Sequence, residues 1–277
     1  MKQFIKKIIS GTVNAIMDLI PGKNNKASFL GLVSRILMNN YNNYVEYDKD
    51  YDMYWLKDKD QYLYMVKTPY FNFSKDKLYN SIERIACQYY TPKKGDVIVD
   101  IGAGIGTETL YFDEKTEKKG KIYSIEASKS SHEKLVELCS KNGIKTSENL
   151  NLAITDNNQK LWIEESNNYQ VDAVNANARG VEVDGITLDH FIKEKQIKNI
   201  DFLKVNIEGS ELQMIDGMKD AIKITRNIAV SCHDFLFDDD RQIKTRISKF
   251  LQENNFQVSY NYTGHKVVDS WIYGTQL

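Results

Sequence analysis

Val97-Ile-Val-Asp-Ile-Gly-Ala-Gly-Ile-Gly-Thr107 is the stretch of this chain that decides its fold. Its apolar run predicts a buried strand. The glycines that follow predict a sharp turn, because glycine adopts positive φ and lets the backbone approach a ligand closely. The helix expected over about 105–113 would point its N-terminal amides at whatever lies over this loop. A strand, a glycine turn and a helix start together are typical of a site for a nucleotide-like cofactor.

The composition is that of a globular chain without a charge bias. Of its 277 residues, 42% are hydrophobic, so the chain can bury one large core and carry an extension. Its 37 basic residues nearly balance its 38 acidic residues, which leaves no electrostatic case for nucleic-acid binding. The cysteines, Cys87, Cys139 and Cys232, show no metal-ligand spacing, and we expect reduced thiols in a cytoplasmic protein.

The first 20 residues combine lysines with an apolar segment, as signal peptides do. Asn14 and Asp18 interrupt that segment, which is also too short and too polar to span a bilayer. Its apolar residues fall near one helical face, and this predicts a helix that packs on the rest of the protein. Peripheral contact of residues 1–20 with an anionic membrane surface is the alternative.

The chain changes character near residue 90. We expect residues 1–90 to form a helical, tyrosine-rich extension, in which Asn39–Tyr64 either packs by its aromatic rings or covers a sugar as a lid. We expect residues 91–277 to form one α/β domain, because strand and helix patterns alternate there. The strand patterns lie at residues 97–101, 121–126, 147–153, 201–207, 227–232, 256–261 and 266–274.

These patterns predict a doubly wound, seven-stranded, mostly parallel sheet. The last two strand patterns are joined by a short connection, Tyr262–Gly264, so we expect a closing hairpin that brings in one antiparallel strand. The helix pattern at 131–142 is well specified, with Ser130 and Glu133 as a capping box and Gly143 at the end.

The glycine spacing and the next strand indicate the type of cofactor. A dinucleotide-binding fingerprint has glycine at the positions of Gly102, Gly104 and Thr107, so the displaced third glycine argues weakly against a nicotinamide site. The strand Ile122–Glu126 ends in a carboxylate, which can accept hydrogen bonds from both hydroxyls of a ribose. The alternative role for Glu126 is that of an acidic neighbour of the next helix start.

Two longer blocks extend this pattern. The first is Gly95-Asp-Val-Ile-Val-Asp-Ile-Gly-Ala-Gly-Ile-Gly, followed by the strand that ends in Glu126. The second joins Ile186-Thr-Leu-Asp-His-Phe-Ile to Ile200-Asp-Phe-Leu-Lys-Val-Asn-Ile-Glu-Gly-Ser-Glu-Leu. Through these blocks the chain resembles the FkbM family of class I S-adenosylmethionine-dependent methyltransferases over roughly residues 95–275. Members of that family mostly methylate hydroxyls of sugars, glycans, lipids or natural products, so the resemblance implies an O-methyltransferase, and we expect a sugar or glycan as the acceptor.

The resemblance also implies which residues hold the cofactor. The glycine loop would cradle the methionine portion, and the aspartate before it would support the turn or the ammonium group. Glu126 would hold the ribose, the residues after it and the third strand would border the adenine, and Asn206 would lie near the reactive methyl group. The implied contacts are Asp100, Gly102, Ala103, Gly104, Gly106, Glu126, Ala127, Ser128, Asn151, Ala153 and Asn206.

Asn206, Glu208 and His233 are the candidates for the chemistry itself. The family usually has Asp at position 206, and Asn cannot take a proton, so we do not expect position 206 to be the base. His233 ends a strand at the ligand-binding edge, and its ordinary pKa suits acceptance of a hydroxyl proton. Alternatively, His233 has a purely structural role and hydrogen-bonds a neighbouring loop. Glu208 and Glu211 lie three residues apart at an expected helix start. They either take part in the chemistry or only stabilise the helix N-terminus through its dipole.

A metal site is not predicted, although Asn206, Glu208, His233 and Asp234 could supply ligands for a divalent ion that orients the hydroxyl. Two other functional classes stay open beside the methyltransferase. One is a nicotinamide-dependent oxidoreductase. The other is a catalytically inert S-adenosylmethionine-binding subunit, which the asparagine at position 206 suggests.

Overall fold

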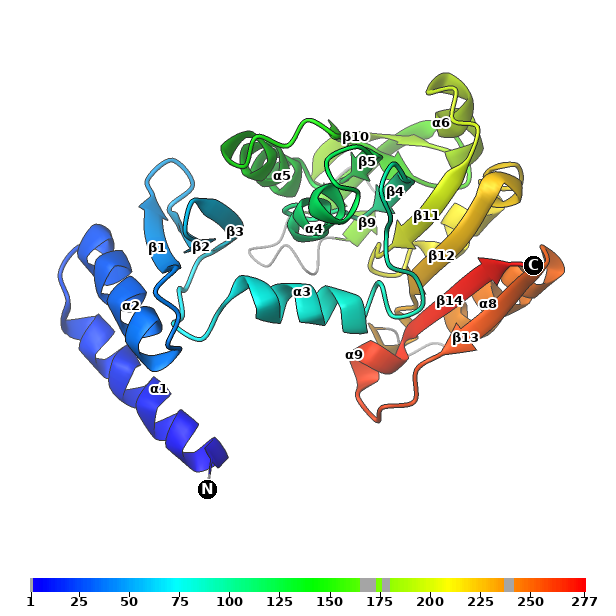
Figure 1. The fold of residues 1–277 in the computed structure, drawn as a ribbon. Helices are drawn as coiled ribbons and strands as arrows, with labels where there is room; N and C mark the ends of the chain where they lie inside the picture. The colour runs from blue at the N-terminus through cyan, green and yellow to red at the C-terminus, as the bar shows by residue number, and fades with distance from the viewer. Residues whose placement is uncertain (1, 165–172, 176–179, 237–241) are drawn as a thin grey trace. The chain divides into compact units, whose positions relative to one another are not determined.

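The computed structural model describes residues 2–164, 173–175, 180–236 and 242–277 of the chain (Figure 1). The chain divides into two units, Met1–Leu78 and Tyr79–Leu277, with helix α3 (Lys75–Arg84) at the junction. Residues 79–90, which the sequence pattern assigns to the extension, therefore belong to the second unit. Over the described residues, no helix is both long and apolar enough to cross a membrane.

The first unit combines two helices with a three-stranded antiparallel sheet. Helix α2 packs closely on the first strand, since a Cβ on Gly31 would lie 3.3 Å from the backbone nitrogen of Val45. The elements are α1 (Lys2–Leu19), α2 (Lys23–Leu37), β1 (Asn43–Asp48), β2 (Met53–Asp58) and β3 (Gln61–Val66).

The expectation of a helical extension is wrong for residues 43–66. The segment instead carries uncharged runs at 53–56 and 61–66 that short polar turns separate, and these runs form strands. Trp55, Leu63 and Met65 are nevertheless fully buried, so the tyrosine-rich region has a core of its own.

The second unit is built on a seven-stranded sheet in the order β13-β14-β12-β11-β4-β5-β6, in which β14 runs antiparallel to both of its neighbours. The doubly wound α/β fold and the closing hairpin are thereby confirmed. The strands are β4 (Val97–Ile101), β5 (Lys121–Ile125), β6 (Ser147–Leu150), β11 (Ile200–Val205), β12 (Thr225–Ser231), β13 (Phe256–Tyr260) and β14 (Trp271–Gln276).

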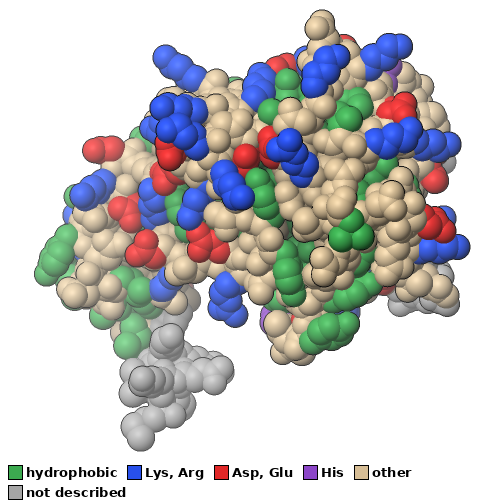
Figure 2. All heavy atoms as spheres, turned by 45° about the vertical axis from the view of Figure 1, so that its right-hand side comes forward, with side chains coloured by type: hydrophobic (Ala, Val, Ile, Leu, Met, Phe, Trp, Pro, Cys, Tyr) green, Lys and Arg blue, Asp and Glu red, His purple; other side chains and the backbone are tan. Residues whose placement is uncertain are grey.

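Side chains alternate between the two faces of this sheet, and helices bury both. Val99 and Ile101 pack into the core formed with α6, α7 and α8. On the other face, Ser124 hydrogen-bonds Thr109 of α4 at 2.9 Å, and Phe202 meets the Phe112 ring of α4. The helices are α4 (Thr107–Lys115), α5 (Lys129–Lys141), α6 (Leu188–Glu194), α7 (Glu211–Asp216), α8 (Ile243–Glu253) and α9 (Lys266–Asp269), with short 3-10 turns at Ala221–Ile224 and Asp234–Leu236. On the face shown in Figure 2, basic and acidic side chains are intermingled.

A second, four-stranded sheet is inserted between β6 and α6, and the sequence patterns miss it. Its order is β7-β10-β8-β9, and Ala153, Leu161, Ile163 and Val183 form its small core. Polar and charged residues interrupt β8 and β10, which explains why no strand was expected between residues 154 and 186. The strands are β7 (Ala153–Ile154), β8 (Gln159–Glu164), β9 (Ala173–Asn175) and β10 (Val181–Ile186).

Three expected element boundaries are corrected. The strand expected at 147–153 is interrupted after Leu150, because the chain there leaves the main sheet for the inserted one. The strand expected from residue 266 begins at Trp271, after the helical turn α9. The N-cap of α5 is Ser128, whose hydroxyl accepts from the Ser131 nitrogen, and not Ser130 in a capping box.

Candidate active site

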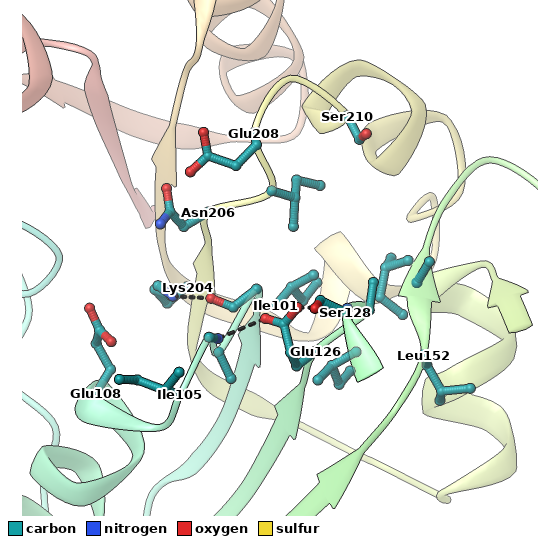
Figure 3. A pocket seen from close by; sticks show the side chains of 18 of the residues that line it. Ile101, Ile105, Glu108, Glu126, Ser128, Leu152, Lys204, Asn206, Glu208 and Ser210 are labelled. Carbon is teal, nitrogen blue, oxygen red and sulfur yellow. Dashed lines mark hydrogen bonds between the residues drawn. The ribbon is translucent and has the colours of Figure 1, made fainter. Parts of the chain in front are cut away.

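A cavity of about 220 Å³ lies at the carboxyl ends of β4, β5 and β11, with the inserted sheet as its far wall (Figure 3). This is the edge where parallel α/β sheets bind ligands. Nine of the residues expected at the site line this cavity: Gly102, Ala103, Gly104, Glu126, Ala127, Ser128, Ala153, Asn206 and Glu208. Asp100, Gly106, Asn151 and His233 do not line it.

The three glycines of the loop have positive φ, but each serves a different purpose. A Cβ on Gly102 would lie 1.9 Å from the carbonyl oxygen of Asn206, so Gly102 permits the close approach of β4 to β11. A Cβ on Gly104 would meet no atom within 4 Å, because this residue borders the open cavity. Gly106 is the N-cap of α4, and a Cβ there would lie 2.7 Å from Leu135 of α5. Gly106 therefore packs two helices together.

Glu126 connects the glycine loop to the next one. Its Oε2 accepts a hydrogen bond from the Gly104 nitrogen at 2.7 Å, and its Oε1 accepts one from the Ser128 nitrogen at 2.8 Å. Burial raises the pKa of Glu126, while these two N–H groups act in the opposite direction. Each carboxylate oxygen keeps a second lone pair, so the side chain can still accept from a ligand hydroxyl.

Asn151 supports the site from behind. Its Nδ2 donates to the carbonyl oxygens of Glu126 at 2.9 Å and Ala127 at 3.0 Å, and thus holds the loop that follows β5. The apolar wall beyond this loop comes from Leu152 and Ile163, which sequence reasoning did not single out. The apolar run at 161–163 is the signal that could have identified it.

Lys204 is the most important residue of the site that sequence reasoning missed. The parallel register places it directly opposite Asp100, and the Lys204 Nζ lies 2.9 Å from Asp100 Oδ1 and 2.7 Å from the Gly102 carbonyl oxygen. Both side chains are almost completely buried. A lysine inside the strand Ile200–Val205, flanked by Leu203 and Val205, is the sequence signal for such a buried pair.

The buried pair is held in its charged form by mutual attraction. Burial raises the pKa of Asp100 to about 6, although the charge of Lys204 acts to lower it. Burial alone would lower the pKa of Lys204, but the charges of Asp100 and Glu108 raise it above its usual value. Asp100 thus lies under the glycine loop and acts on it through Lys204.

Asn206 and Glu208 lie together at the end of β11, where both line the cavity (Figure 3). Glu208 has φ +49°, which is uncommon for a residue with a side chain, and Gly209 follows with φ +103°. Strained turns of this kind occur where a structure must hold a functional side chain in place. Burial raises the pKa of Glu208, while the neighbouring His233 acts to lower it.

His233 lies behind Glu208. Its Nδ1 is 2.6 Å from Oε1 of Glu211, and its Nε2 is 3.4 Å from Oε2 of Glu208. Burial alone would lower the pKa of His233, but the hydrogen bond and charge of Glu211, with smaller effects of Glu208 and Asp234, raise it. The structure thus brings the histidine and both glutamates of the sequence motif together.

Asp234 does not join this group. Its carboxylate accepts hydrogen bonds from the backbone nitrogens of Ile243 at 2.5 Å and Lys244 at 3.0 Å, at the start of α8. In the part of the chain that the structure describes, no three His, Cys, Asp or Glu side chains are arranged to hold a metal ion.

A family model described as the methyltransferase FkbM domain matches residues 100–258, which is more than half of the chain. The chain belongs to the FkbM methyltransferase family. The resemblance read from the sequence is confirmed, and membership of this family decides against a nicotinamide-dependent oxidoreductase.

Solved structures similar to this FkbM methyltransferase include an FkbM methyltransferase from Methylobacillus flagellatus KT, with 19% identity and a TM-score of 0.48 over 65% of this chain and 43% of that one. A methyltransferase from Streptococcus mutans in complex with SAH has 12% identity and a TM-score of 0.46, covering 74% of this chain and 100% of that one. This chain thus spans less than half the length of the Methylobacillus protein. No curated protein matches it.

The residues of the cavity fit the S-adenosylmethionine that this family implies. The space over Gly104 is one that a Cβ would begin to fill, Glu126 presents a carboxylate, and Leu152 and Ile163 offer an apolar surface for a ring. These features are what the methionine, ribose and adenine portions require, in that order along the cavity wall.

Alanine substitutions at two glycines of the loop should separate folding from binding. We expect Gly102→Ala to lower the free energy of unfolding by about 3 kcal/mol, because strain at positive φ adds to a backbone clash. Gly104→Ala should lower it by only about 1 kcal/mol but weaken binding of S-adenosylhomocysteine roughly tenfold, because the methyl group enters the cavity. Urea unfolding and calorimetric titration measure the two effects. Equal losses of stability would contradict this division of roles.

Removal of Lys204 should leave a buried charge without its partner. We expect Lys204→Met to lower the free energy of unfolding by about 3–5 kcal/mol, and Asp100→Asn in the same chain to restore part of it. Without Lys204, the pKa of Asp100 in the folded state rises further above its unfolded value, so the variant keeps stability at acid pH and loses it as pH rises through that pKa. Urea unfolding of Lys204→Met at about pH 5 and about pH 8 tests the sign of this pH dependence. A loss of free energy of unfolding that is larger at about pH 5 than at about pH 8 would refute it.

Proposed function

We propose that this chain transfers a methyl group from S-adenosylmethionine to a hydroxyl oxygen, and that the acceptor is a sugar or glycan. The observation that supports this most is a carboxylate, Glu208, in the same cavity as the glycine loop. Gly102 and Gly104 would hold the methionine portion, Glu126 the ribose, and Leu152 and Ile163 the adenine. Asn206 and Glu208 would then face the acceptor hydroxyl.

Bound S-adenosylmethionine would supply an electrophilic methyl group that the acceptor oxygen takes, while the carbon–sulfur bond breaks with its electron pair left on sulfur. The chain's own contribution is to place the hydroxyl and to receive its proton. Orientation and proximity of the two reactants account for much of the acceleration in such a displacement. Asn206 can hydrogen-bond the hydroxyl as donor or acceptor, but it cannot take the proton. A carboxylate beside it can.

Within the first unit, one tyrosine ring is open to a saccharide. Tyr41 is 75% exposed, whereas Arg35 lies over the Tyr44 ring and the Tyr70 ring contacts Phe73. Exposed aromatic side chains offer both an apolar face and a polar tip, which suits a sugar ring. FkbM proteins mostly methylate hydroxyl groups, which agrees with this assignment.

Titration calorimetry with S-adenosylhomocysteine and with NAD, followed by turnover of labelled S-adenosylmethionine on a panel of sugars and glycans, tests the proposal. We expect binding of S-adenosylhomocysteine but not of NAD, and a labelled methyl group on an ether oxygen of one acceptor. Glu126→Ala should weaken binding by about 10- to 100-fold, because it removes both the ribose contact and the two loop hydrogen bonds.

Glu133→Ala, at an exposed position of α5, is the matched control and should bind normally. Label found only on nitrogen or carbon of the acceptor would overturn the assignment to a hydroxyl.

A further inference from the structure

We propose that Glu208 is the residue that receives the hydroxyl proton, and that His233 and Glu211 position it as a chain of three side chains running from the cavity into the core. This inference rests on the proposed function and deepens it. Sequence reasoning placed the proton on His233. The geometry of the site points to the glutamate in front of it.

Exposure falls in order along the chain of three. The side chain of Glu208 is 24% exposed, that of His233 is 5% exposed, and that of Glu211 is fully buried. Glu208 lines the cavity and the other two do not. A hydroxyl bound in the cavity can therefore reach Glu208 directly, whereas it reaches His233 only through Glu208.

Glu211 fixes the inner end of the chain. Its Oε1 accepts a hydrogen bond from the Gly209 nitrogen at 3.0 Å and lies 2.6 Å from Nδ1 of His233. Its Oε2 is buried and has no hydrogen-bond partner among the described residues. A buried carboxylate needs a countercharge, and the imidazolium form of His233 provides it. Glu211 thus holds both the imidazole ring and the backbone next to Glu208.

His233 has little capacity left for an additional proton. As an imidazolium it donates from Nδ1 to Glu211 and from Nε2 toward Glu208, so neither nitrogen has a free lone pair. The Ser231 hydroxyl lies 3.4 Å from the same Nε2. The other charged groups that act on this pair are Asp234, near His233, and Lys204, on the cavity side of Glu208.

The proton transfer balances without a further reactant. The O–H bond of the acceptor breaks as its oxygen takes the methyl group, and the electron pair of that bond stays on the oxygen. The proton forms a bond with a carboxylate oxygen of Glu208 and passes to water when the product leaves. His233 keeps its proton throughout and stabilises the carboxylate form of Glu208 before the reaction.

Isosteric amide variants of the two glutamates, together with His233→Gln, test this order. We expect Glu208→Gln to lower kcat by about 10²- to 10⁴-fold, with affinity for S-adenosylhomocysteine nearly unchanged, because general-base catalysis is lost. Glu208→Asp, which keeps a carboxylate, should recover part of the activity. Glu253→Gln, an exposed glutamate of α8, is the matched control and should retain full activity.

His233→Gln and Glu211→Gln should lower kcat by only about 10- to 100-fold, with little change in the KM of the acceptor. In His233→Gln the acid limb of the kcat–pH profile should move to higher pH, because Glu208 loses the positive charge that lowers its pKa. A residue with a merely structural role would not move that limb. NMR titration should find that the imidazole of His233 loses its proton at lower pH in Glu211→Gln than in the wild-type chain.

Two results would overturn this inference. One is a Glu208→Gln variant that keeps its kcat within about twofold of the wild-type chain. The other is a His233→Gln variant that is less active than Glu208→Gln, with no shift in the pH profile. Failure of the proposed function has a different signature, since the wild-type chain would then bind S-adenosylhomocysteine but methylate no hydroxyl acceptor.

Discussion

The site depends on the close approach of β4 to β11 at their carboxyl ends. Gly102 permits that approach because its missing Cβ would fall 1.9 Å from the Asn206 carbonyl oxygen. The Lys204 side chain then ties the two strands together through Asp100 and the Gly102 carbonyl group. Because the glycine loop leaves one strand and Asn206 and Glu208 follow the other, this contact sets the distance between the glycine loop and these two side chains.

Two buried carboxylates, Asp100 and Glu211, each hold a basic side chain in place next to one half of the cavity. Asp100 is neutralised by Lys204, which holds the glycine loop. Oε1 of Glu211 lies 2.6 Å from Nδ1 of His233, which lies against Glu208. In each case a buried carboxylate fixes a basic side chain, and that side chain lies against a group that lines the cavity. Neither carboxylate borders the cavity itself, so both act through their partners.

The sequence predicts the main sheet and most of the cavity because those features depend on local patterns. Apolar runs identify β4, β5, β11 and β12, and the glycines with Glu126 locate the ligand-binding edge. The inserted sheet gives a weaker signal because Glu182 and Asp184 alternate with apolar residues in β10, and β1–β3 lie in a segment whose tyrosine content, and not its strand pattern, guided the prediction. The supporting roles of Asn151, Gly106 and Lys204 depend on contacts between distant segments. Only the folded chain shows those contacts.

A crystal structure of the chain with S-adenosylhomocysteine tests the central claim most directly, namely that one cavity holds the methyl donor and the proton acceptor side by side. The account predicts ribose hydroxyls within hydrogen-bond distance of the Glu126 carboxylate and a sulfur atom on the side of Asn206 and Glu208. A ligand bound outside this cavity, or a sulfur atom directed toward Ile163 and away from Glu208, would contradict it.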